Sequence, residues 1–189
     1  VIVCVVADAT ENGSETGTSF RQALYFKEIG LNIHDTMIWS KGCFTAVGAL
    51  QTRYAQTFEY MFVFSKGKPK PFNAIKDRKN KKAFKKMQGT IRKNDGSLRV
   101  MPSLGKRYSE HGTRFNIWDI YPELSNSNRF HPAQFPESLA RDHILSWSNP
   151  GDTILDPFMG AGTTGKMALL NDRGFIGIEK VDKYYEIAK

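Results

Sequence analysis

The sequence predicts an α/β protein built on an open, Rossmann-like and mostly parallel β-sheet. Three observations support this prediction: short apolar β-rich runs alternate with helical patterns, a glycine-rich turn joins a strand to a helix, and one strongly basic stretch interrupts the alternation. A chain of 189 residues with 40% hydrophobic residues can bury one ordinary core and carry a small appendage. We therefore expect one main domain with a basic insert.

The first half of the chain carries three predicted strands and one helix. Residues 1–6 form an apolar β-rich run, and Ser19 is a candidate N-cap for a helix that ends at Gly30. Residues 33–39 and 58–64 are two further short runs with β-branched and aromatic side chains, which is typical of strands. The first run starts without a preceding turn or an initiator Met, so we expect the chain to be a fragment of a longer protein.

The second half repeats the alternation of strands and helices. Its predicted elements are a helix with Pro136 as first residue, a strand over 153–156, a helix over 163–170, a strand over 175–179 and a helix over 184–189. This order favours a mostly parallel sheet.

Composition excludes several classes of protein. No run of 18 uncharged apolar residues exists and the N-terminus lacks the pattern of a signal peptide, so we expect a soluble, cytoplasmic protein. The two cysteines, Cys4 and Cys43, lie in apolar surroundings without metal-ligand spacing. They are predicted to be reduced core thiols, with no metal site.

Positive charge is concentrated in residues 66–114, which contain 16 Lys and Arg against three acidic residues. The rest of the chain has 11 Lys and Arg against 16 Asp and Glu. One basic insert on an acidic body indicates a polyanion partner, with nucleic acid the leading candidate, although a Lys run taken alone is also typical of a solvated loop. The candidate contacts are Lys79, Lys81, Lys82, Lys85, Lys86, Arg92, Lys93, Arg107 and Arg114.

The sharpest local signal is the segment from Asp156 to Gly165, D-P-F-M-G-A-G-T-T-G, which follows a strand and opens a helix. Glycines allow the backbone to turn tightly there and to approach a ligand closely. Glu179 stands at the end of the following predicted strand, where a carboxylate can accept hydrogen bonds from ribose hydroxyls. The pattern therefore predicts a nucleoside cofactor.

Three interpretations of this turn remain open: a dinucleotide site, a site for S-adenosylmethionine, and a purely structural turn. Gly160, Gly162 and Gly165 fit the G-x-G-x-x-G pattern of dinucleotide sites. Asp156 argues against that reading, because a carboxylate at the strand tip would repel a pyrophosphate, whereas it would attract the ammonium and sulfonium groups of S-adenosylmethionine. We therefore favour S-adenosylmethionine.

These residues resemble the amino-group (N4-cytosine or N6-adenine) DNA methyltransferases of the circularly permuted β class. The resemblance rests on Asp156 to Thr164, on Gly177-Ile178-Glu179 and on Phe130-His131-Pro132-Ala133-Gln134-Phe135-Pro136. The triplets at 58–60, 66–68 and 116–118 resemble the edges of the family's target-recognition insert. The order of strands, basic insert and cofactor half is also similar.

The resemblance implies S-adenosylmethionine as cofactor and double-stranded DNA as substrate. It implies a division into catalytic-half strands and helix over 1–65, a basic target-recognition insert over 66–128 and a cofactor-binding half over 129–189. The implied cofactor-binding residues are His131, Pro132, Gln134, Asp156, Pro157, Phe158, Gly160, Gly162, Thr163, Thr164 and Glu179. Outside that context, His131 would be an ordinary histidine satisfied by backbone groups.

Family members also carry a catalytic D-P-P-Y-like tetrapeptide that holds the flipped target base. None of the eight prolines here are adjacent, so that tetrapeptide is absent, and by resemblance it is expected upstream of Val1 with one further strand. No catalytic residue is therefore assigned in this chain, which is expected to bind cofactor and DNA with little or no turnover. A cognate restriction endonuclease or the upstream segment is an expected partner.

Two alternatives to an active DNA methyltransferase stay open. One is a catalytically inactive DNA-binding module, or one part of a split enzyme, that keeps the cofactor fold. The other is methyl transfer to RNA or a small molecule, which only the permuted motif order disfavours. A role near the target base for Arg53 and Tyr54 is balanced against an ordinary surface position.

Overall fold

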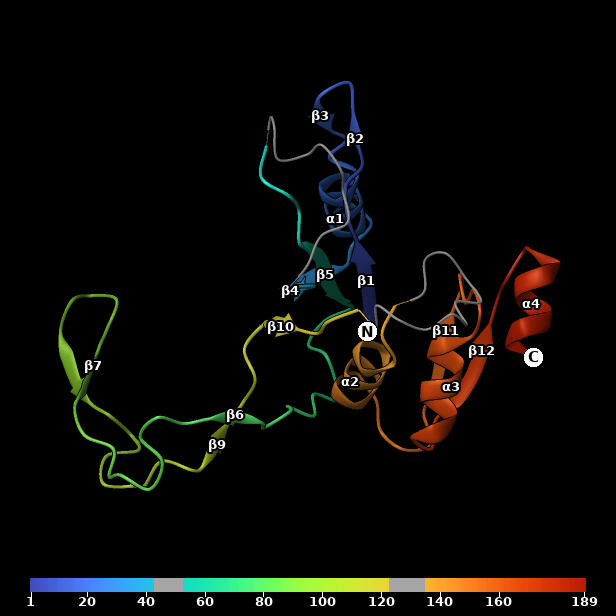
Figure 1. Ribbon diagram of the computed structural model, residues 1–189. Helices are drawn as coiled ribbons and strands as arrows, with labels where there is room; N and C mark the ends of the chain where they lie inside the picture. Colours follow the sequence, from blue (N-terminus) through green and yellow to red (C-terminus); the bar gives the residue numbers. More distant parts are fainter. Residues whose placement is uncertain (43–52, 123–134) are drawn as a thin grey trace. The chain divides into compact units, whose positions relative to one another are not determined.

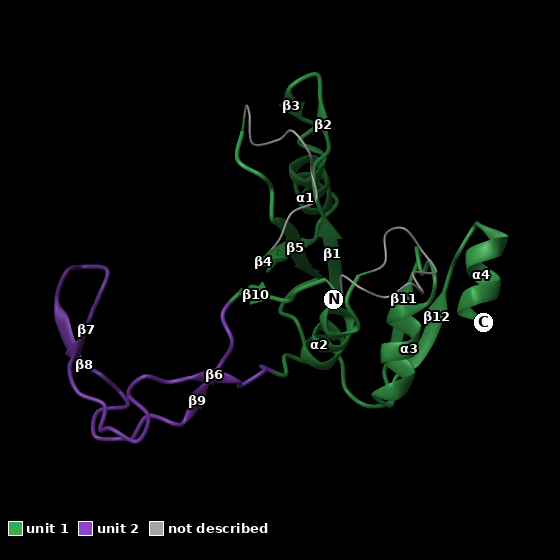
Figure 2. Ribbon diagram, viewed as in Figure 1, with its two compact units in different colours: residues 1–73, 116–189 green, residues 74–115 purple. Residues whose placement is uncertain are grey.

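The computed structural model describes residues 1–42, 53–122 and 135–189. The chain divides into two compact units (Figures 1 and 2). Unit 1 comprises Val1–Asn73 and Asn116–Lys189, and unit 2 comprises Ala74–Phe115. Unit 2 therefore falls inside the basic insert expected over residues 66–128 and is shorter at both ends.

Unit 1 contains a four-stranded sheet in the order β1 (Ile2–Val6), β5 (Phe58–Ser65), β4 (Asn32–Ser40) and β10 (Ile117–Asp119). Strand β5 pairs antiparallel with both β1 and β4, whereas β10 pairs parallel with β4. The α/β class is as predicted, but this sheet is mixed. The connections explain the difference: β1 and β4 are joined through helix α1 (Thr18–Glu28) and run in the same direction, while no helix separates β4 from β5 in the described part of the chain.

Helix α1 begins after Gly17, and Ser19 is not its N-cap. Gly17 occupies the N-cap with a left-handed φ of 65° and no side-chain cap. Ser19 lies inside the helix, is buried, and donates hydrogen bonds from its backbone N–H and its hydroxyl to the carboxylate of Asp8. The hydroxyl bond is the main cause of the lowered pKa of Asp8. Asp8, which follows β1, therefore anchors the start of α1 in place of the predicted cap.

Strand β5 is buried on both faces, because successive side chains of a strand point to opposite sides. Phe62 and Phe64 pack on one face with Ala23 of α1. Met61, 0% exposed, faces helix α2 (Glu137–Trp147), where its Sδ lies 3.2 Å from Nε2 of His143. The sheet is thus covered by a helix on each side.

Helix α2 also packs against helix α3 (Thr163–Leu170). Ala140 and Ile144 of α2 form one buried cluster with Met167 and Ala168 of α3. Pro136 is the N-cap of α2 and not its first helical residue, a difference of one position from the prediction.

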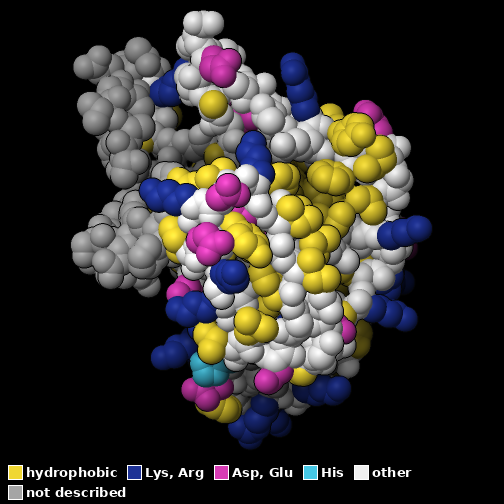
Figure 3. All heavy atoms as spheres, turned by 90° about the vertical axis from the view of Figure 1, so that its right-hand side faces the viewer, with side chains coloured by type: hydrophobic (Ala, Val, Ile, Leu, Met, Phe, Trp, Pro, Cys, Tyr) yellow, Lys and Arg dark blue, Asp and Glu magenta, His cyan; other side chains and the backbone are white. Residues whose placement is uncertain are grey.

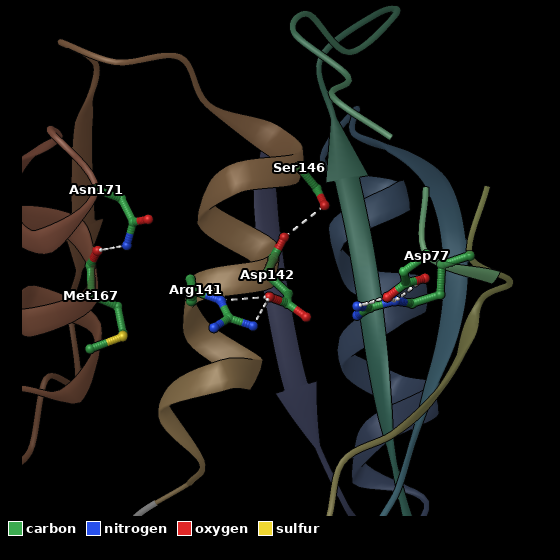
Figure 4. A network of polar contacts seen from close by, with 7 residues as sticks. Asp77, Arg141, Asp142, Ser146, Met167 and Asn171 are labelled. Atoms are coloured by element: carbon green, nitrogen blue, oxygen red, sulfur yellow. Dashed lines mark hydrogen bonds and ion pairs between the residues drawn. The ribbon is translucent and has the colours of Figure 1, made fainter. Parts of the chain in front are cut away.

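Polar side chains on α2 find partners close to the helix. Asp142 is buried and ion-paired with Arg141 at 2.8 Å, and the hydroxyl of Ser146 donates to the carbonyl of Asp142 at 2.7 Å (Figure 4). These contacts lower the cost of burying polar groups beside the apolar cluster.

The C-terminal part carries a second, parallel sheet of β11 (Thr153–Asp156) and β12 (Gly174–Gly177), followed by helix α4 (Asp182–Ala188). The predicted bounds of β11 and α3 are those observed, whereas β12 and α4 are shifted by one or two residues. Arg173, which is buried, donates to the carbonyl of Ser148 at 2.7 Å and to its hydroxyl at 3.0 Å. This arginine joins the start of β12 to the end of α2.

Only one face of the β11–β12 pair is covered in the described part of the chain. Ile154 and Phe175 pack on the cluster of α2 and α3, whereas Leu155 and Ile176 on the opposite face are 60% and 56% exposed. Figure 3 shows hydrophobic side chains gathered on this side of the molecule. Parallel sheets are usually covered on both faces, so the exposure of these apolar side chains is unusual.

Unit 2 consists of short antiparallel ladders without a core of its own. Strand β6 (Arg78–Lys79) pairs with β9 (His111–Gly112), and β7 (Thr90–Arg92) forms a hairpin with β8 (Leu98–Val100). All of residues 74–115 are described and none of them is buried. Backbone pairing therefore holds much of this unit together, and its side chains are half-buried or exposed.

In the described ranges no helix is both long and apolar enough to cross a membrane. Cys4 is a half-buried free thiol, and burial raises its pKa. Cys43 lies outside the described residues, as do His131, Pro132 and Gln134.

The buried side chain of His143 makes the free energy of unfolding depend on pH. Burial between α2 and the sheet lowers its pKa from 6.5 to about 4, although the nearby Asp142 opposes the shift. The unfolded chain then binds more protons between these values, so the free energy of unfolding falls as pH decreases through this window. Urea denaturation should show a loss of about 2 kcal/mol between pH 7.5 and 5 that is attributable to this residue.

The matched variant is His143→Gln, which keeps a neutral polar side chain and every other titratable group. Its free energy of unfolding should change less between these two pH values than that of the unmodified chain. Equal pH dependence in both proteins would contradict the assignment.

Candidate functional site

The glycine-rich turn lies between the end of β11 and the start of α3, at the carboxyl ends of two parallel strands. It doubles back onto the segment after β12, since the N–H of Met159 donates to the carbonyl of Ile178 at 3.0 Å, and the N–H of Ile178 donates to the carbonyl of Asp156 at 2.9 Å. Ligands of open α/β sheets bind at this edge. The turn is therefore in the place that the sequence predicted for a cofactor.

Two glycines are required by backbone conformation. Gly160 has a φ of 54°, and Gly162, the N-cap of α3, has a φ of 83°. A Cβ on Gly162 would also approach the Cβ of Ala188 in α4 to 3.0 Å. These positions let the chain reverse from strand to helix within a few residues.

Two further glycines are required by close packing. A Cβ on Gly165 would lie 2.5 Å from the ring of Phe175, and a Cβ on Gly177 would lie 2.2 Å from Sδ of Met159. The helix and loop can therefore approach β12 only because these residues have no side chain. This is the helix–strand contact that the third glycine of such turns serves.

Two carboxylates flank the turn. Asp156 accepts a hydrogen bond from the N–H of Phe158 at 3.0 Å. Glu179 accepts from the N–H of Gly160 at 3.0 Å and from the N–H of Val181 at 2.8 Å. The sequence predicted Glu179 as a ribose ligand but missed this second role as a brace of the turn, for which the 19-residue spacing to Gly160 was the available signal.

Carboxylates at these two positions are suited to accept hydrogen bonds from a ligand. A carboxylate has about four acceptor positions, and the bond from the N–H of Phe158 occupies one of those of Asp156. Two negative groups beside the turn suit a ligand with hydroxyls and positive charge, and they disfavour a pyrophosphate. The donor set therefore fits S-adenosylmethionine better than a dinucleotide.

The remaining predicted residues of the turn lie in the same segment. Thr163 is buried in the first turn of α3 and Thr164 is half-buried, so both lie close to the glycines in the chain. Pro157 is exposed, and Phe158 is 87% exposed, which leaves its ring available to a ligand.

The predicted nucleic-acid contacts fall within or at the surface of unit 2. This unit contains 13 Lys and Arg against three acidic residues. Of the nine predicted cations, eight are exposed: Lys79, Lys81, Lys82, Lys85, Lys86, Arg92, Lys93 and Arg107.

Arg114 is the exception among the nine. It is half-buried and bonded through Nε to both carboxylate oxygens of Asp77, at 3.0 and 3.2 Å, with a further ion pair through Nη2. Hydrogen bonding from this arginine is the main cause of the lowered pKa of Asp77. The pair joins the two ends of unit 2, which favours a structural role for Arg114.

The two residues singled out in the 42–56 region differ in their surroundings. The guanidinium of Arg53 donates to the hydroxyl of Thr10 at 3.0 Å and to the carbonyl of Gly13 at 2.6 Å. These bonds join residue 53 to the small hairpin of β2 (Thr10–Glu11) and β3 (Ser14–Glu15). Tyr54 is 96% exposed.

Comparison with known proteins places these features in context. The sequence model described as DNA methylase matches residues 1–189. The protein named orphan methyltransferase M.BamHII, from Bacillus amyloliquefaciens, is 53% identical over 195 residues, which cover 100% of this chain and 72% of that protein.

Two solved structures resemble the fold. A complex of M1.HpyAVI with SAM has a TM-score of 0.65 at 23% identity, with 99% of this chain and 71% of that chain covered. The cytosine-N4-specific PvuII DNA methyltransferase has a TM-score of 0.68 at 18% identity, with 98% and 61% covered. The α/β methyltransferase fold is thereby confirmed.

Substitution of Gly165 tests the packing that shapes the turn. In an open helical site, Gly→Ala would stabilise the chain by up to about 1 kcal/mol. Here the clash with the Phe175 ring should reverse the sign, so we expect Gly165→Ala to lower the free energy of unfolding by about 1–3 kcal/mol in urea. A second variant, Gly165→Ala with Phe175→Leu, should lose less than the sum of the two single changes. A more stable Gly165→Ala chain would contradict the contact.

Proposed function

Because the chain belongs to the DNA methylase family, we propose that it transfers a methyl group from S-adenosylmethionine to an exocyclic amino group of adenine (N6) or cytosine (N4) in double-stranded DNA. The observation that carries the proposal is the pair of carboxylates, Asp156 and Glu179, around a glycine turn at the carboxyl ends of β11 and β12. The family gives the reaction, and this geometry supports the cofactor.

The residues of the turn bind and orient the cofactor. Bound S-adenosylmethionine supplies an electrophilic methyl group, which passes in line to the amino nitrogen. Glu179 would accept hydrogen bonds from ribose hydroxyls, and Asp156 would favour the positively charged end of the cofactor. Catalysis of this kind depends on position and electrostatics, so a turn held by backbone bonds and packed glycines suits it.

Unit 2 supports the choice of DNA as substrate. Its 13 Lys and Arg side chains face only three carboxylates, and one of these, that of Asp77, is ion-paired with Arg114. Phosphate contacts by such cations fix a protein on duplex DNA without reading its sequence. A duplex also requires the target base to leave the stack before its amino group can react.

A second candidate function is an inactive DNA-binding module or one part of a split methyltransferase. Its specific support is that no two prolines are adjacent among the 189 residues, so no D-P-P-Y-like tetrapeptide is present. Incubation with plasmid DNA and tritiated cofactor separates the candidates. Incorporation into N6-methyladenine or N4-methylcytosine would support the enzyme and would contradict the low turnover expected from the absent tetrapeptide. DNA binding without incorporation agrees with that expectation, and absence of S-adenosylmethionine binding as well would favour the module.

Two further expectations accompany a DNA substrate. A cytoplasmic location follows from where bacterial DNA resides, and a cognate restriction endonuclease stays an untested partner. The relative from Bacillus amyloliquefaciens is itself named an orphan methyltransferase.

Calorimetric titration tests the cofactor directly. We expect the chain to bind S-adenosylmethionine and not NAD, because the carboxylates repel a pyrophosphate. Asp156→Asn and Glu179→Gln should each weaken binding by about tenfold or more, the size expected for loss of a charged hydrogen bond. Asp172→Asn is the matched control, since it makes the same charge change at an exposed position between α3 and β12. Binding of NAD alone would overturn the cofactor assignment.

Salt dependence tests the DNA surface. Each neutralised phosphate should contribute a slope of about −0.9 to log affinity against log salt. Alanine at Lys81, Lys82, Lys85 and Lys86 together should flatten that slope. The control replaces four exposed cations of unit 1, Arg21, Lys27, Lys183 and Lys189, for the same loss of charge. Equal slopes in both variants would leave the lysines of unit 2 as solvated surface.

A further inference from the structure

Phe84 is an aromatic residue in an unfavourable backbone conformation with its side chain in solvent. Its φ is 63°, in the left-handed region that glycine and asparagine adopt far more readily than phenylalanine. The residue is 61% exposed, so burial of the ring does not compensate for the conformation. A residue whose strained backbone is not offset by burial of its side chain is a candidate for a functional role.

The backbone around Phe84 is held from both sides. Its N–H donates to the carbonyl of Tyr108 at 2.9 Å, and its carbonyl accepts from Nη1 of Arg107 at 3.2 Å. Next to it, the N–H of Tyr108 donates to the carbonyl of Lys85 at 3.0 Å, and Lys86 forms a β-bridge with Arg107. These bonds fix the turn and direct the ring outward without contacting the ring itself.

The charges next to Phe84 are of one sign. In sequence it stands between Lys81-Lys82 and Lys85-Lys86, and all four lysines are exposed. Arg107, which bonds its carbonyl, adds a fifth exposed cation. An exposed aromatic ring flanked in sequence by exposed cations is a combination that binds nucleic acid, because phosphates meet the cations and bases stack on the ring.

Phe115 in the same unit provides a contrast. It is similarly exposed at 65%, but the guanidinium of Arg78 lies 4.3 Å from its ring centroid. Within the described residues, no aromatic or cationic partner contacts the ring of Phe84 in this way. Its aromatic face is therefore open to a ligand.

We propose that Phe84 is a positioning residue that inserts its ring between adjacent base pairs of bound DNA, while the flanking lysines hold the phosphates. The proposal rests on the proposed function of unit 2 as a DNA-binding surface. Apolar wedges of this kind partly unstack a base step and kink the duplex.

The test compares Phe84→Ala, Phe84→Gly and Phe84→Trp in the full chain with a random-sequence duplex over a range of salt concentrations. The Ala and Gly variants should lose affinity, though by less than the roughly 5- to 150-fold that one base–aromatic stack contributes on single strands, because opening a base step of the duplex costs part of that gain. The loss should be the same at every salt concentration, because the ring carries no charge, and Phe84→Trp should keep the affinity. Phe115→Ala is the matched control and should bind as the unmodified chain does.

A second readout reports insertion itself. Closed-circular plasmid relaxed by topoisomerase in the presence of the chain should show a changed linking number, because a wedge unwinds the duplex. At equal occupancy, Phe84→Ala should produce little or no change.

Three outcomes would overturn the proposal. Unchanged affinity and unwinding in Phe84→Ala, with the salt slope of the unmodified chain intact, would remove the wedge and leave the DNA-binding function standing. Loss in Phe84→Ala with recovery in Phe84→Gly would assign the effect to the turn and not to the ring. Absence of salt-dependent binding by the unmodified chain would remove both the wedge and the DNA-binding function.

Discussion

The packing of helix α2 between the four-stranded sheet and α3 is the contact on which the rest of unit 1 depends. Within the described residues, the β11–β12 pair shares no hydrogen-bonded ladder with the β1–β5–β4–β10 sheet. The two are joined instead through α2, which meets β5 at Met61 and buries Ile144 against α3. The ring of His143 on the same helix lies tilted against Trp118 of β10, with the ring centroids 4.5 Å apart. The position of the glycine turn relative to the main sheet therefore depends on side-chain packing.

Such an interface has little tolerance for polarity. His143 Nδ1 and Trp147 Nε1, one helical turn apart on α2, are buried without hydrogen-bond partners in the described part of the chain. A buried polar atom that lacks a partner costs stability, and a charge there would cost much more. Packing of α2 on the sheet therefore requires the neutral form of His143. At the C-terminal end of the same helix, Arg173 donates a hydrogen bond to the carbonyl of Ser148.

The sequence predicted local features well and non-local partners poorly. The bounds of β11 and α3 were predictable because proline, glycine and threonine at 150–163 give strong start and stop signals. The direction of β5 was not, because its apolar run indicates burial on both faces but not the direction of pairing. The same limit hid the bond from Gly160 to Glu179, the replacement of Ser19 by Asp8 as anchor of α1, and the pairing of Arg114 with Asp77, since each joins residues that only the fold brings together.

The two units differ in how closely their side chains are packed. In unit 1, the glycine turn tolerates almost no change of shape, because Gly165 and Gly177 leave no room for a Cβ. In unit 2, no residue is buried, and Asp77 with Arg114 joins its two ends, so most substitutions between them alter only the exposed surface. Surface substitutions change stability little compared with core substitutions. The exposed surface of unit 2 can therefore change in sequence at little cost in stability, whereas the glycine turn of unit 1 depends on the absence of side chains at Gly165 and Gly177.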